Sequence, residues 1–325
     1  MTEFLLKKQL QSHQIGTNPL LEKLLTQAWK ESRARHGNRL SVHIPGMFVV
    51  NGRRGRYRAV SITGDVCTLD CEHCKGLLLK TMSHAETPEA LLRLGHETAA
   101  RGDYGMLITG GCDERGRLPW EKFLDTIDRL TSETNLTITI HSGQVNKGTA
   151  KSLKQAGVSQ ALVDVIGDDS TARDIYHLKE GISIIRKTLD SLSEAGLEIV
   201  PHILYGLHYG IEKGERTALE MLAHYPLSRY VVVVLMPFRG TPMELVSPPE
   251  PQSVAAFIAK ARLRFPSLKA SLGCARPRGK YRQELDDLAI QAGINSLALP
   301  SDRALQKAQK MGLELAHYET CCSLG

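Results

Sequence analysis

The chain has 325 residues, of which 42% are hydrophobic, enough for one large α/β domain or two ordinary ones. Lysine and arginine total 41 against 35 acidic residues, and this mild net charge of +6, with no basic stripe interleaved with aromatic residues, argues against nucleic-acid binding. Because no stretch reaches the length of a membrane span and the first residues lack the features of a signal peptide, we expect a cytoplasmic protein without membrane attachment, whose clustered cysteines hold metal.

The first 55 residues are predicted to be a helical N-terminal extension followed by a linker. The densest basic stretch, "NGRRGRYR", runs across the end of this segment. We interpret it as solvated chain, with a phosphate or carboxylate contact as the alternative. Its arginines are Arg53, Arg54, Arg56 and Arg58.

Eight short apolar runs follow, and they read as strands of a buried parallel sheet. They cover residues 57–63, 105–110, 136–141, 160–167, 198–204, 230–236, 269–274 and 295–300. Helical patterns lie between them, and two of these open with prolines, Pro88 and Pro251, as helices often do. The alternation predicts an α/β fold with a (β/α)8 TIM-type barrel over residues 56–325, full or near full, and a six-unit partial barrel is the near alternative.

The cysteines fall at the ends of predicted strands, where a barrel places its chemistry. Cys67 follows the first strand, Cys112 the second, and Cys274 closes the seventh. Cys321 and Cys322 lie beyond the last helix, in a tail that we expect to fold over the barrel mouth.

Three cysteines share one loop, "CTLDCEHC", at Cys67, Cys71 and Cys74. Zinc in a structural site normally has four protein ligands, and this loop supplies three. A [4Fe–4S] cluster held by three cysteines would keep one iron open for a substrate or a cofactor. A zinc site and plain structural cysteines are the alternatives.

This C-x3-C-x2-C spacing after the first strand of a parallel barrel resembles the radical S-adenosylmethionine (SAM) superfamily. The resemblance implies that Cys67, Cys71 and Cys74 bind a [4Fe–4S] cluster, whose open iron takes the amino and carboxylate groups of SAM. It also implies a 5′-deoxyadenosyl radical that abstracts hydrogen from an unactivated carbon. His73 stands where the family usually has Tyr or Phe near the adenine, and an imidazole can still stack there.

Three further segments resemble cofactor-binding parts of the biotin-synthase-like branch. "ITGG", with Gly110 and Gly111, matches the turn at the SAM amino group, although Cys112 replaces the family's Glu. Asp164 matches an Asp near the SAM ribose or the substrate. Met236 and Pro237 begin a segment, "MPFRGTPME", that resembles the one after strand six.

The spare cysteines suggest a second cluster. In biotin synthase an auxiliary cluster inside the barrel is the sulfur source, so the resemblance implies a second [4Fe–4S] cluster here, with candidate ligands Cys112, Cys274, Cys321 and Cys322. "SLGCARPRG" places Cys274 or Arg276 near the Arg ligand of that enzyme, but the fifth strand carries His202 and no cysteine. Unremarkable buried thiols are the alternative.

The whole pattern resembles one subunit of the two-protein lipoyl synthase. The resemblance implies sulfur insertion into a protein-bound octanoyl-lysine, with a companion radical SAM protein making the other carbon–sulfur bond. It also implies an octanoylated lipoyl domain or H-protein as substrate and a ferredoxin- or flavodoxin-type electron donor. Another enzyme of the same branch, a methylase or a hydrogenase-cofactor maturase, and a zinc-stabilised barrel without activity remain alternatives.

Overall fold

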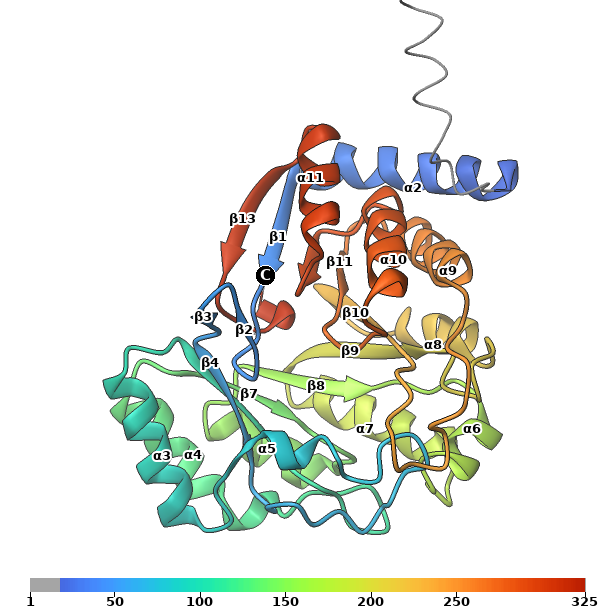
Figure 1. Cartoon of the computed structure of the whole chain (residues 1–325). Coiled ribbons are helices and arrows are strands. Elements are labelled where there is room, and N and C mark those ends of the chain that lie inside the picture. Colours follow the sequence, from blue (N-terminus) through green and yellow to red (C-terminus); the bar gives the residue numbers. More distant parts are fainter. Residues whose placement is uncertain (1–17, 325) are drawn as a thin grey trace, which may run out of the picture.

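A curved parallel sheet of eleven strands forms the centre of the molecule, and helices cover its convex side (Figure 1). The structure, a computed structural model, describes residues 18–324. The strand order is β13-β1-β12-β11-β10-β9-β8-β7-β6-β4-β5, and all the pairings are parallel. Within the described residues no pairing joins β13 to β5, so the sheet is an open, barrel-like α/β fold.

The eight predicted strands are all present, in the predicted order. They are β4 (Tyr57–Ser61), β6 (Gly105–Thr109), β7 (Thr137–His141), β8 (Gln160–Asp164), β9 (Glu198–Tyr205), β10 (Arg229–Val234), β11 (Lys269–Leu272) and β12 (Ser296–Ala298). The structure adds β1 (Arg39–His43), β13 (Glu314–Tyr318), β5 (Ser83–His84) and an antiparallel hairpin of β2 (Val49–Val50) and β3 (Arg53–Arg54).

The helices begin where the sequence supplies capping side chains. Thr87 and Asn146 each accept a hydrogen bond from a backbone amide of the following first turn. The α-helices are α2 (Pro19–His36), α3 (Pro88–Ala100), α4 (Leu124–Glu133), α5 (Lys147–Gln155), α6 (Asp169–Asp174), α7 (Ile182–Glu194), α8 (Glu215–Leu222), α9 (Pro251–Arg264), α10 (Lys280–Gln291) and α11 (Asp302–Lys310). Short 3-10 turns are η1 (Leu79–Thr81), η2 (Trp120–Lys122) and η3 (Cys322–Leu324). No helix among residues 18–324 combines the length and apolar content that crossing a membrane requires.

The N-terminal segment contains the expected helix, α2, but part of the expected linker forms strand β1. Strand β1 lies within the central sheet and pairs with both β12 and β13. Helix α2 packs against α9 and α10, and the Ser32 hydroxyl donates to the Gly293 carbonyl at 2.6 Å. The first 17 residues of the expected extension lie outside the described residues.

The β2–β3 hairpin spans the gap between β13 and β4, which we call the seam (Figure 1). On one side, the Arg56 amide donates to the Glu319 carbonyl at 2.6 Å. On the other, the Tyr104 amide donates to the Arg56 carbonyl at 2.9 Å. The seam is therefore bridged by single backbone hydrogen bonds to a loop instead of a strand ladder.

Two apolar clusters follow from the alternation of side chains along the strands. The larger one lies between the sheet and the helices. The smaller one lies on the concave face and contains Leu162, Val200, Val231 and Val233. Cys322 from the C-terminal tail belongs to this inner cluster and is 3% exposed, so the tail reaches inside the sheet.

Candidate functional site

The three-cysteine loop leaves β4 and is tied down at several points. Lys75 holds its fold through ion pairs with Asp70 at 3.0 Å and Glu72 at 2.9 Å. His177, from the loop after α6, contacts the Leu69 carbonyl and the Glu72 carboxylate. These contacts tie the loop to itself and to the chain after α6.

The turn after β6 supports the loop through its backbone. The amides of Thr68 and Leu69 donate to the Cys112 carbonyl at 2.8 and 3.1 Å, and the Cys112 amide donates to the Cys67 sulfur at 3.4 Å. A Cβ on Gly111 would overlap the Val66 carbonyl oxygen and lie 2.6 Å from the Cys67 Cα. Gly111 is thus required by the close approach of the two loops.

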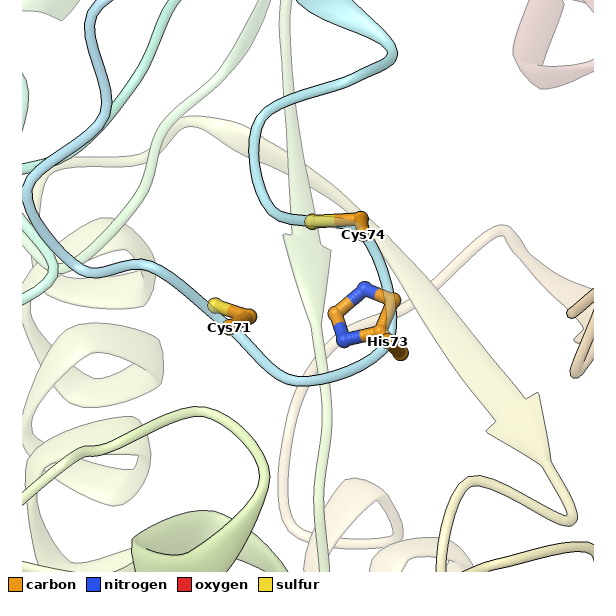
Figure 2. Close-up of side chains that lie close together, drawn as sticks. All are labelled: Cys71, His73 and Cys74. Atoms are coloured by element: carbon orange, nitrogen blue, oxygen red, sulfur yellow. The ribbon is translucent and has the colours of Figure 1, made fainter. Parts of the chain in front are cut away.

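Cys71, His73 and Cys74 form a cluster of metal-ligand atoms, one from each side chain, all within 4.8 Å of one another. Figure 2 shows the imidazole within the bend of the loop that carries Cys71 and Cys74. The His73 ring also stacks on Tyr176, with ring centroids 4.9 Å apart, and the Tyr176 hydroxyl donates to Asp164 at 3.0 Å. The expected stacking partner of His73 was an adenine.

The two thiols of this cluster have different proton affinities. A hydrogen bond from the Cys71 thiol lowers the pKa of Cys74 to about 4, and the same bond raises the pKa of Cys71. Of the two thiols, Cys74 is therefore the one in which the thiolate, the form of cysteine that binds metal, is favoured.

Cys112 lies beside the three-cysteine loop. Burial first, and then the nearby Cys67, raise the pKa of its thiol. Gly111 and Cys112 line a separate cavity of about 460 Å³, together with Arg117 and Gln144. This cavity has no lining residue in common with the one described next, which the other spare cysteines line.

A central cavity of about 270 Å³ opens along the concave face of the sheet. One part of its wall carries His73, Asp164, Tyr176 and Met236. Another part carries all three remaining cysteines, and leucines and valines line the space between, namely Leu107, Leu162, Leu204 and Val233. The sequence motifs near four different strands thus meet at one cavity.

Cys274, just after β11, lies close to Cys321 and Cys322 of the C-terminal tail within this cavity wall. We call these three residues together the tail cysteines. The Ser271 hydroxyl donates to the Cys322 carbonyl at 3.3 Å and fixes the tail to β11. A hydrogen bond from the Cys322 thiol lowers the pKa of Cys321 to about 6, whereas burial raises the pKa of Cys274 to about 11. These three thiols form the second sulfur group of the molecule.

Two histidines also face the central cavity. The rings of His141 and His202 lie 5.2 Å apart, centroid to centroid. Burial lowers the pKa of both, that of His202 to about 4, so both are neutral imidazoles at neutral pH. In the sequence, only their positions at the end of β7 and within β9 indicate that they face a site. That indication is weak because the chain has twelve histidines.

The remaining predicted residues fall in different places. Gly110 packs against Thr63 and Leu118 and lines neither large cavity, and Pro237 does not line the central cavity. Arg276 is fully buried and bonded to Asp286 at 2.8 Å and to the Gly273 carbonyl at 2.6 Å. Sequence reasoning missed the cavity-lining residues Phe48, Tyr57, Tyr176, Arg278 and Arg282.

The donors around the loop suit an iron–sulfur cluster. Three cysteines share one short loop: Cys71 and Cys74 lie in the group within 4.8 Å, whereas Cys67 lies outside that group and its sulfur accepts a hydrogen bond from the Cys112 amide. Cys67, Cys71 and Cys74 would hold it. The tail cysteines offer a second sulfur group that would suit another cluster.

Known proteins of similar sequence are biotin synthases, although no protein-family model matches the chain. The biotin synthase of Halorhodospira halophila is 27% identical over 254 residues, which cover 74% of each chain. That of Cenarchaeum symbiosum is 25% identical over 248 residues, which cover 73% of this chain and 74% of that one.

Solved structures show the same fold at lower identity. HydG, a maturase of the [FeFe]-hydrogenase, matches with a TM-score of 0.67 and 16% identity over 93% of this chain and 70% of its own. Methylornithine synthase (PylB) matches with a TM-score of 0.60 and 17% identity over 93% of this chain and 91% of its own. Together with the cysteine loop, the sequence likeness marks the chain as a distant homologue of biotin synthase in the radical SAM, biotin-synthase-like group, and the two solved structures show the fold that it shares with them.

Proposed function

We propose that this protein inserts sulfur into an octanoyl chain carried on a lysine of another protein, making one of the two carbon–sulfur bonds of the lipoyl group. One observation carries the proposal. A single cavity with leucine and valine walls is lined by His73 of the cluster loop and by a second group of three cysteines. The space between is apolar, which suits an alkyl chain.

The chemistry explains why two sulfur groups would share the cavity. An alkyl C–H bond has no acidic proton, so a side-chain base does not activate it. A [4Fe–4S] cluster with SAM, when bound, supplies the 5′-deoxyadenosyl radical that removes such a hydrogen atom. The chain's own residues orient the reactants: Cys67, Cys71 and Cys74 hold the cluster, and Asp164, placed by the Tyr176 hydroxyl, accepts hydrogen bonds from SAM or the substrate.

The tail cysteines would hold a second [4Fe–4S] cluster as the source of sulfide. Their depth in the lumen supports this role, since Cys322 is 3% exposed and packs on Val231 and Val233. Apolar walls keep water away from a carbon radical. Cys112 is left out of this ligand set because it lies beside Cys67.

The proposal includes three partners. An octanoylated lipoyl domain or H-protein would present its lysine arm at the carboxyl ends of the strands, where the cavity residues His141 and Asp164 lie. A companion radical SAM protein would make the other carbon–sulfur bond. A ferredoxin- or flavodoxin-type protein would supply the electron.

Iron and sulfide content after anaerobic reconstitution tests the proposal. We expect about eight irons per wild-type chain, and about four in each of two triple variants. One replaces Cys67, Cys71 and Cys74 by Ala, and the other replaces Cys274, Cys321 and Cys322. The second variant should still cleave SAM but form no thiolated octanoyl peptide. Cys112→Ala is the matched control and should keep about eight irons.

Other iron counts would contradict sulfur insertion. About four irons in the wild type, all lost with the loop cysteines, would favour the methylase or cofactor-maturase alternative. Zinc in place of iron would favour a zinc-stabilised barrel, for which the His73 nitrogen beside Cys71 and Cys74 is the specific observation.

A further inference from the structure

The arginines of the basic stretch "NGRRGRYR" separate in the folded chain. Arg56 stacks on Tyr104 at 4.4 Å and donates to the Gly102 carbonyl, so it holds the seam together. Arg53 is exposed on the hairpin. Arg54 and Arg58 face another way, into a small cavity that we call the seam pocket.

The seam pocket has a volume of about 160 Å³ and a third arginine, Arg101, in its wall. Asp103 supplies the only carboxylate among its lining residues, and it pairs with Arg101 at 3.8 Å. Among the lining residues, three guanidinium groups therefore face one carboxylate. Within residues 18–324, the guanidinium groups of Arg54 and Arg58 make no hydrogen bond and no ion pair.

Of the three arginines, Arg58 has the most firmly fixed backbone for holding a ligand, because it lies in strand β4. Burial lowers the pKa of its guanidinium, and the like charges of Arg101 and Arg54 lower it further, while Asp103 and Glu97 oppose that effect. Guanidinium groups gathered in this way repel one another unless an anion joins them. The Ser83 hydroxyl, also in the wall, adds a neutral hydrogen-bond donor.

The backbone around the pocket is tightly packed. A Cβ on Gly55 would overlap the Ile44 carbonyl oxygen, and one on Gly46 would overlap that of Tyr57. Gly46, Met47 and Ala59 line both the seam pocket and the central cavity. A ligand in the seam pocket would therefore lie one layer of residues away from the central cavity.

We propose that the seam pocket binds a small oxyanion, a phosphate or carboxylate group, through Arg54, Arg58 and Arg101. Arginine suits such groups because its planar fork donates two parallel hydrogen bonds to them. The inference rests on this pocket alone and does not depend on sulfur insertion.

Calorimetric titration of the reconstituted, oxidised full-length protein tests the proposal. Inorganic phosphate and acetate are titrated separately at constant ionic strength, since salt screens exposed charges. We expect saturable binding to the wild type that weakens about tenfold or more in Arg58→Gln and in Arg54→Gln. Arg53→Gln, the neighbouring arginine that does not line the pocket, is the matched control and should bind within about twofold of the wild type.

Each outcome decides the matter. Tighter phosphate binding would point to a phosphate-bearing ligand, and tighter acetate binding to a carboxylate, and either supports an oxyanion site. Absence of saturable binding, or an equal loss in Arg53→Gln, would overturn it, because the effect would then be one of general charge. Arg54 lies on the exposed hairpin, so its variant remains informative if Arg58→Gln does not fold.

Discussion

At the scale of single residues, Gly111 shows how one sequence feature acquires a different reason in the structure. The sequence suggests that the glycine lets the backbone approach a bound cofactor. In the folded chain it lets the turn after β6 approach the cysteine loop, where the Cys112 amide reaches the Cys67 sulfur. The same contact places Cys112 beside the three-cysteine loop, whereas the sequence groups it with Cys274, Cys321 and Cys322.

Gly111→Ala tests this packing role. The added methyl would overlap the Val66 carbonyl and press on Cys67, and overpacking of this kind costs about 1–3 kcal/mol in free energy of unfolding. We expect that loss in urea unfolding, with reduced iron retention at the loop. Gly148→Ala in helix α5 is the control, since its Cβ would lie 3.2 Å from the Asn146 side chain and alanine favours helix. Equal stability of the two variants would refute the packing role.

At the scale of elements, strand β1 makes the N-terminal segment part of the sheet. Leu40 is fully buried, and β1 separates β12 from β13 by pairing with both. Removal of this segment would expose the edge of β12 and leave β13 without a neighbour. The part of this segment that we expect to be a linker is therefore a strand of the central sheet, and the expected helix, α2, precedes it.

Leu40→Ala measures how far the domain depends on β1. Truncation of a buried leucine costs about 2–5 kcal/mol, and we expect a loss in that range in the free energy of unfolding. Leu20→Ala, at a site on helix α2 that is 76% exposed, is the control and should change stability by less than about 0.5 kcal/mol. A Leu40→Ala protein as stable as the control would show that β1 is dispensable.

At the scale of the whole molecule, the curvature of the sheet creates the central cavity. Residues from β6 to β10, the turn after β11, the loop after β4 and the tail line this cavity, although more than 240 positions separate His73 from Cys321 in the chain. The cavity can therefore join two chemical groups that the sequence places far apart.

Leu204→Trp tests whether the substrate occupies the apolar space between the two sulfur groups. Leu204 lines the cavity, and a larger side chain there would fill the apolar space. If the proposed function holds, SAM cleavage should continue while the thiolated octanoyl product falls about tenfold or more. Leu245→Trp, at a site that is 91% exposed, should leave both unchanged. Unaltered product formation in Leu204→Trp, with iron content equal to wild type, would show that the substrate does not occupy this space.

The sequence by itself determined the eight strands, their parallel order and the cysteine loop. Short apolar runs with helical patterns between them, helix caps and the C-x3-C-x2-C spacing are all local patterns. Only the tertiary structure decided which distant residues meet. It placed Cys112 beside Cys67, directed Arg276 to Asp286, and separated Arg54 and Arg58 from Arg56. Strand β1 was not predicted from the sequence because its partners, β12 and β13, lie some 250 residues or more further along the chain. Pairings at such separation depend on packing of the whole sheet, which no short window of sequence records.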